Sequence, residues 1–132
     1  MTCRFERVIG TDEQIKVLYE MLSDRTHKIS HSSKPSFVDH ADFVKNNPYT
    51  HWFLVQIDSE YCGSLYQKPD NSIGLNLQTW NSATLRDCVT FVRDTLVPNP
   101  ARPSVVPPYL YVNVAASNRE LIKHLQDLGL SP

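Results

Sequence analysis

The stretch that decides the fold is "NVAASNRELIKHLQDLGL", residues 113–130. An apolar strand pattern over 109–114 runs into it, and leucine and isoleucine side chains then recur at helical spacing. A Ser-x-x-Glu capping box predicts the start of this helix, and Gly129 predicts its end. We therefore expect a strand, a tight turn and a helix, with Asn113 and Asn118 placed around the turn.

Upstream, the chain predicts three strands in quick succession. The ranges 51–57, 61–67 and 72–78 are rich in apolar and aromatic residues, and only "DSE" and "KPDN" separate them. Connections this short join antiparallel neighbours. The first of the three, "HWFLVQI", is apolar on both faces and is expected in the interior of the sheet.

The remaining segments predict an opening strand and three further helices. We expect the strand at 3–9 and helices at about 12–25, 37–46 and 82–96, the second with Phe37, Ala41 and Val44 on one stripe. The order is β-α-α-β-β-β-α-β-α, an α/β fold with a mixed, mainly antiparallel sheet. The strand–helix–strand unit over 72–114 requires a crossover, which makes the last two strands neighbours. We expect a single domain spanning 1–132.

Composition excludes several classes of function. The 132 residues are 41% hydrophobic and carry 13 basic against 14 acidic side chains, a net charge of −1 that argues against nucleic-acid binding. No apolar run approaches the roughly 20 residues that span a bilayer, so no membrane partner is expected. The N-terminus has no signal-peptide core, which predicts a cytoplasmic location.

Cysteine and histidine usage predicts neither a disulfide framework nor a metal site. The three cysteines, Cys3, Cys62 and Cys88, are odd in number and widely spaced, and Cys88 falls on the apolar side of a helix. His27 and His31 are four residues apart, but their segment is loop-like and supplies no third ligand.

The element order and the C-terminal stretch together resemble the GNAT N-acetyltransferase superfamily. Its members begin the last of these helices with a pattern of the type N-x-x-A/S-I-x-x-Y/F-x-x-x-G-F. The matching residues here are Asn118, Leu121, Ile122, Leu125, Gly129 and Leu130. The segment 29–77, with "PYTHW", "GSLY" and "SIGL", is similar to acetyltransferases associated with amino-sugar and surface-polysaccharide pathways. The resemblance covers about residues 3–130 and rests on several weak matches together.

The resemblance implies transfer of an acetyl group from acetyl-CoA, as co-substrate, to a small amine such as an amino sugar. Backbone groups of the strand at 72–78 would hold the pantetheine arm and polarise the thioester, and the loop after it would bind the pyrophosphate. His31, on the acceptor side, is the candidate base. The candidate cofactor-binding residues are Leu75, Leu77, Gln78, Asn81, Ser82, Ala83, Asn113 and Asn118.

The sequence departs from the family pattern in three places. Asn81 stands where the pyrophosphate loop has a glycine, and Leu125 stands where a tyrosine often protonates the departing thiolate. The chain ends at Pro132, where the family has two more strands, so a partner chain is expected to complete the sheet in a homodimer.

Structural alternatives remain for the candidate residues. Asn118 can simply satisfy the helix terminus, Ser82 can be an N-cap, and Trp80 can be a packing residue instead of a lid. The second hypothesis for the whole chain is a GNAT-fold protein without catalysis that acts as a binding or assembly module. The third is an unrelated α/β interaction domain, in which the strands at 72–78 and 109–114 would pair along their whole length.

Overall fold

The computed structural model describes residues 3–23, 36–78, 81–100, 107, 109–112 and 119–130. Within them the element order is the predicted one. The elements are β1 (Cys3–Arg7), α1 (Asp12–Ser23), α2 (Phe37–Lys45), β2 (His51–Ile57), β3 (Glu60–Gln67), β4 (Ser72–Leu77), α3 (Ser82–Thr95), β5 (Tyr111–Val112) and α4 (Arg119–Asp127).

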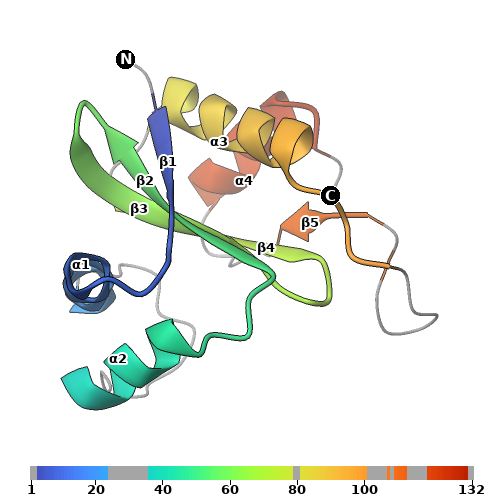
Figure 1. The fold of residues 1–132 in the computed structure, drawn as a ribbon. Helices are drawn as coiled ribbons and strands as arrows, with labels where there is room; N and C mark the ends of the chain where they lie inside the picture. The colour runs from blue at the N-terminus through green and yellow to red at the C-terminus, as the bar shows by residue number, and fades with distance from the viewer. Residues whose placement is uncertain are drawn as a thin grey trace.

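The five strands form one sheet in the order β1-β2-β3-β4-β5. The first four are antiparallel, and β5 is parallel to β4, where Ser72 pairs with Tyr111 and Ile73 with Val112. Helices α1 and α2 lie on one side of this sheet, and α3 and α4 lie on the other (Figure 1). The mixed sheet and the parallel last pair confirm the predicted fold class.

The sheet has a core on each face because strand side chains alternate between faces. On the α3 side, Phe53 and Val55 of β2 pack with the buried thiols of Cys62 and Cys88. On the α1–α2 side, Trp52 and Leu54 of β2 pack with buried residues of the two helices, Ile15, Leu18 and Val44. Strand β2 is therefore buried on both faces, as its composition predicts.

A third cluster joins α3 to α4. Leu85 of α3 is fully buried against Leu121 and Leu125 of α4. Leu75 and Leu77 of β4 pack against the same cluster and so anchor both helices to the end of the sheet.

Two helix boundaries follow the predicted chemistry. At the start of α1, the Gln14 N–H donates to Thr11 Oγ1 at 3.2 Å and the Thr11 N–H donates to Gln14 Oε1 at 3.4 Å, which completes the capping box. After α4, Gly129 has a φ of 96°, and the Leu130 N–H donates to the Leu125 carbonyl. This is the glycine C-cap that the sequence predicts.

The stripe predicted for α2 is not buried along its whole length. Phe37 is 48% exposed, and the residues buried on α2 are His40 and Val44. His40 Nε2 lies 3.2 Å from the Ile15 carbonyl of α1, so a polar contact between the helices takes the place assigned to an apolar one. The rings of Phe37 and Tyr19 on α1 form a T-shaped pair with centroids 5.2 Å apart.

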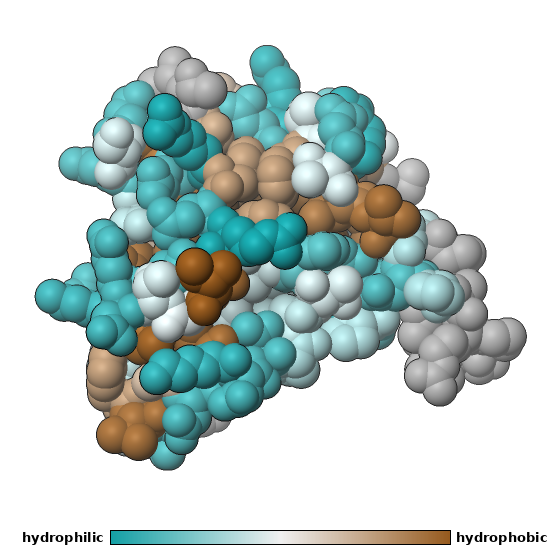
Figure 2. Space-filling model, viewed as in Figure 1, coloured by the Kyte–Doolittle hydropathy of each residue, from teal (hydrophilic) through white to brown (hydrophobic). Residues whose placement is uncertain are grey.

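The surface shown in Figure 2 is mainly hydrophilic, and its brown side chains lie in separate patches. Ile9 and Val97, each 74% exposed, are the most exposed large hydrophobic residues among those described. Separate exposed side chains of this kind do not indicate a binding surface. In the described part of the chain, no helix has the length and apolar character needed to cross a membrane.

Candidate functional site

The backbone of β4 is hydrogen-bonded to β3 through its even-numbered residues. At one end, the Lys68 N–H donates to the Ser72 carbonyl at 2.9 Å; at the other, the Gln78 N–H donates to the Cys62 carbonyl at 2.8 Å. The pairing between these two bonds is regular. Because successive backbone groups of a strand point to opposite sides, the odd-numbered residues of β4 face β5.

Two leucines of β4 direct their backbone N–H and C=O groups past the described part of β5. The Tyr111 N–H of β5 donates to the Asn71 carbonyl at 3.1 Å, and the described pairing ends at Ile73. Leu75 and Leu77 continue the same odd-numbered series. Among the described residues, β5 supplies no partner for their backbone groups.

Four residues separate the end of β4 from the start of helix α3, and the last of them, Asn81, is the N-cap of the helix. Asn81 Oδ1 accepts hydrogen bonds from the Thr84 N–H at 2.9 Å and from Thr84 Oγ1 at 3.1 Å. The cap is therefore Asn81, not Ser82, which corrects one of the sequence-based alternatives. Ser82 and Ala83 are exposed, and their N–H groups have no acceptor among the described residues.

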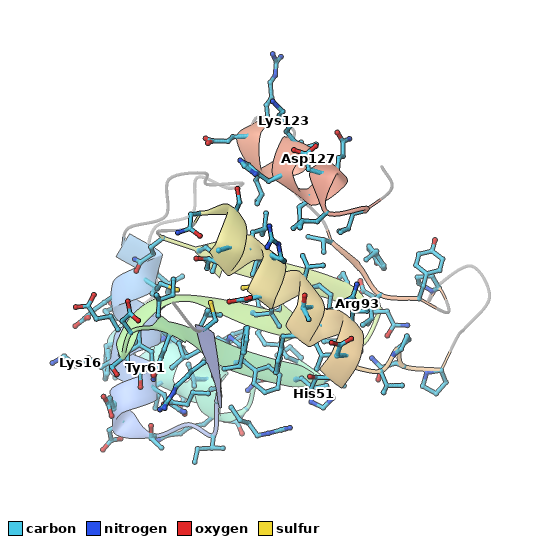
Figure 3. The ribbon with its side chains drawn as sticks, turned by 90° about the horizontal axis from the view of Figure 1, so that it is seen from above. Lys16, His51, Tyr61, Arg93, Lys123 and Asp127 are labelled. Atoms are coloured by element: carbon cyan, nitrogen blue, oxygen red, sulfur yellow. The ribbon has the colours of Figure 1, made fainter. Side chains whose placement is uncertain are left out.

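The first turn of α3 holds no acidic side chain that would repel an anion. Asp87, one turn further on, is directed towards Cys3 of β1. Burial raises the pKa of Cys3 to about 11, and the negative charge of Asp87 and a hydrogen bond to it contribute to this shift. Ser82 Oγ lies 3.2 Å from His124 Nδ1 of α4, so an imidazole stands beside the helix start. Lys123 of α4 points away from α3 and the sheet (Figure 3).

Solved structures of N-acetyltransferases share this arrangement of elements. Aminoglycoside N-acetyltransferase AAC(6')-Ib11 is 12% identical over 98% of this chain and 86% of its own, with a TM-score of 0.65. The Campylobacter jejuni N-acetyltransferase PseH is 14% identical over 95% of this chain and 84% of its own, with a TM-score of 0.59. The chain has the GNAT fold.

A third structure of this fold contains a cofactor. Aminoglycoside acetyltransferase AAC(6')-Ib was solved in complex with coenzyme A, and it is 12% identical over 98% of this chain and 84% of its own, with a TM-score of 0.64. Protein-family models give no match to the sequence, and neither do curated proteins.

Within this GNAT fold, six predicted site residues lie on one continuous segment. They are Leu75, Leu77, Gln78, Asn81, Ser82 and Ala83, which run from the end of β4 to the first turn of α3. The side chains of the two leucines are half-buried and pack against the cluster between α3 and α4, while their backbone groups face β5. The predicted residues His31, Asn113 and Asn118 lie outside the described residues, as does Trp80.

Leu125 is a core residue of α4. It is 5% exposed and packs against Leu85 and Leu121. A side chain without a polar atom, buried in this way, donates no proton.

One residue that positions the site was missed by the sequence analysis. The turn "KPDN" was predicted, but Asn71 at its end is fully buried with a φ of 71°. Its side-chain amide donates to the Asn99 and Pro107 carbonyls of the connection that leads to β5. An asparagine after Pro-Asp suits a left-handed turn position, but nothing local indicates its distant partners.

Proposed function

We propose that the chain is an N-acetyltransferase that moves the acetyl group of acetyl-CoA to a primary amine of a small molecule, with an amino sugar as the favoured acceptor class. The observation that carries this proposal is the segment from β4 to α3. It joins the β5-facing backbone of Leu75 and Leu77 to the exposed N–H groups of Ser82 and Ala83.

Each part of this segment fits one part of acetyl-CoA. The N–H groups at the start of α3 suit the pyrophosphate, because a helix N-terminus offers free donors and a favourable dipole. The N–H and C=O groups of Leu75 and Leu77 suit the amide-rich pantetheine arm, and an N–H there can polarise the thioester carbonyl. We assign Asn113 and Asn118 to the pantetheine arm and His31 to the acceptor side as base.

The comparisons support the same reaction class. The structural neighbours include aminoglycoside acetyltransferases, one of them solved with coenzyme A and another with sisomicin. Those proteins share the GNAT fold with this chain at 12–14% identity. An amine acceptor and an acetyl-CoA donor are therefore the first ligands to test.

A second candidate function is a GNAT-fold binding module without catalysis. Two observations favour it: Leu125 supplies no proton, and the side chain of Asn81 occupies the loop position where glycine would allow closer approach. In this alternative the chain recognises a partner and does not turn over acetyl-CoA.

Calorimetric titration with acetyl-CoA separates these functions. We expect saturable binding in the micromolar range and a rise in melting temperature, because a ligand that binds only the folded state stabilises it. CoA release would then be followed with a panel of primary amines that includes glucosamine and sisomicin. Absence of binding at millimolar acetyl-CoA would contradict the enzyme hypothesis, and binding without CoA release would favour the binding module.

We further propose one domain over residues 1–132 that forms a homodimer in the cytoplasm. Strand β5 lies at the edge of the described sheet, and edge strands are usually covered. The thiols of Cys3, Cys62 and Cys88 are free, which fits a reducing compartment. Light scattering that gives the mass of one chain at micromolar concentration would contradict the dimer.

A further inference from the structure

A tyrosine of β3 lies flat across a glycine of β4. A Cβ atom added to Gly74 would stand 1.9 Å from Cζ of Tyr66 and within 2.4 Å of both neighbouring ring carbons. Real Cβ atoms do not approach other atoms this closely, so only glycine leaves room for the ring. The far end of the Tyr66 ring, which carries the hydroxyl, therefore lies over the β4 backbone.

Aromatic packing holds the ring in this position. Tyr66 is stacked on Tyr49, with ring centroids 4.2 Å apart and an interplanar angle of 11°, and Tyr49 meets Trp52 edge-on at 5.0 Å. Since Tyr66 starts on β3 and its Cζ lies over Gly74, the hydroxyl is directed across β4, away from β3. It has no hydrogen-bond partner among the described residues.

The hydroxyl lies on the face of the proposed acetyl-CoA site that is turned towards α1 and α2. On the α3–α4 face of β4, the half-buried side chains of Leu75 and Leu77 pack against the leucine cluster, so this face is apolar and does not suit a polar acceptor. The opposite face of β4 carries small or polar residues, Ser72, Gly74 and Asn76, and no residue of β4 belongs to the cluster under α1 and α2. An acceptor amine would therefore approach the thioester from the face on which Tyr66 lies.

We propose that the Tyr66 hydroxyl is the catalytic acid of the acetyl transfer, a proposal that rests on the proposed function. The neutral amine attacks the thioester carbonyl carbon and forms the C–N bond. When the C–S bond breaks, the electron pair goes to sulfur, which takes the Tyr66 proton. The phenolate then takes a proton from the acylated nitrogen, so the products are an amide, a CoA thiol and an unchanged tyrosine.

Tyr66→Phe tests this role because it removes the hydroxyl and keeps the stacked ring. We expect kcat for CoA release from acetyl-CoA, with glucosamine and sisomicin as probe amines, to fall about 100-fold, within the range of general acid–base catalysis. The KM for acetyl-CoA and its calorimetric affinity should not change, because the hydroxyl acts only in the transition state.

Tyr61→Phe is the matched control. Tyr61 is also on β3 and packs in the same cluster under α1 and α2, but its hydroxyl donates to Glu6 at 3.1 Å. Figure 3 places it beside α1. This variant should lose stability and keep its kcat.

Gly74→Ala supplies a second test through the position of the ring. Its Cβ must displace the Tyr66 ring, so kcat should fall in the wild-type background and show no further fall in the Tyr66→Phe background. Circular dichroism and melting temperature establish that each variant is folded.

The outcomes separate this proposal from the proposed function. A Tyr66→Phe variant with wild-type kcat overturns the role of Tyr66 and leaves the enzyme intact. Tyr61→Phe with an equal loss of kcat also overturns it, since the effect would then be structural. CoA release that never exceeds the rate without protein, for any probe amine, overturns both.

Discussion

The Asn71 side chain accepts a hydrogen bond from the Asn99 N–H at 2.6 Å and so joins the β3–β4 turn to the connection between α3 and β5. The same side chain donates to the Asn99 carbonyl at 3.1 Å and to the Pro107 carbonyl at 2.7 Å. The backbone carbonyl of Asn71 accepts a hydrogen bond from the Tyr111 N–H at 3.1 Å. One buried amide therefore places the start of β5 beside β4, where the candidate site begins.

Replacing Asn71 by alanine should lower the free energy of unfolding by about 3 kcal/mol, because buried partners lose their hydrogen bonds. Alanine also tolerates the φ of 71° less well than asparagine does. Urea unfolding measures the loss. Asn46→Ala is the control, since Asn46 is an exposed C-cap residue of α2. A loss no larger than that of the control would contradict the role of Asn71.

Replacement of Gln14 is expected to cause a second large loss of stability. This residue is 4% exposed; its Oε1 accepts from the Ile9 and Gly10 N–H groups, and its Nε2 donates to Glu6 and to the Arg7 carbonyl. Gln14→Ala should lower the free energy of unfolding by about 3 kcal/mol, since several polar groups lose a partner.

The matched control for Gln14 is Gln126→Ala on the exposed side of α4. A surface substitution of this kind usually changes stability by about 0.5 kcal/mol or less. Equal urea midpoints for the two variants would show that the Gln14 network contributes little.

Local chemistry explains why most of the fold could be predicted from the sequence. The capping box at Thr11 and Gln14, the stop at Gly129 and the short turns between strands each depend on neighbouring residues, and all three are confirmed. The predictions are wrong where a contact with a residue far away in the sequence determines the structure. Periodicity places Phe37 on one stripe with Val44, but Phe37 is exposed, and His40, which contacts the Ile15 carbonyl of α1, is buried in addition to Val44.

The candidate site was predictable as a segment but not in its details. Strand β4 followed at once by α3 was visible in the sequence, whereas the choice of Asn81 over Ser82 as N-cap depends on where the helix starts within one residue. The ring of Tyr66 over Gly74 depends on the register of two strands, which no single residue reveals.

The buried thiol of Cys88 predicts a loss of stability in mild base. Burial, and then the nearby thiols and Asp87, raise its pKa from 9.0 to about 12. Between these two values the unfolded chain releases the thiol proton and the folded chain keeps it. The contribution of the neutral Cys88 thiol to the free energy of unfolding is therefore fully present below pH 9 and is lost as the pH rises towards 12.

Guanidinium unfolding at pH 8 and pH 10, with reductant present, measures this effect. The tyrosines Tyr61 and Tyr111, whose pKa values are also raised by burial, add to the slope in the same direction. Cys88→Ala should therefore show a smaller loss between the two pH values, although it is less stable at both. If Cys88→Ala loses as much stability between pH 8 and pH 10 as the wild type does, the thiol is not a cause of the loss.

Ser82→Asp distinguishes an anion site at α3 from an ordinary helix start. Ser82 is exposed in the first turn, which contains no acidic residue. A carboxylate there should stabilise the protein by about 0.5 kcal/mol through the helix dipole. The same charge would face the pyrophosphate of acetyl-CoA, so we expect the affinity to fall at least about tenfold, equivalent to about 1.4 kcal/mol.

Ser82→Asp is therefore expected to raise the stability of the protein and to lower its affinity for acetyl-CoA. Ser82→Asn is the neutral control, because it also removes the hydroxyl that lies 3.2 Å from His124 Nδ1. Acetyl-CoA affinity is measured by calorimetry, and stability by urea unfolding. If both variants bind acetyl-CoA like the wild type, the pyrophosphate is not held at α3. If both lose affinity equally, the hydroxyl and its contact with His124 matter, and the charge does not.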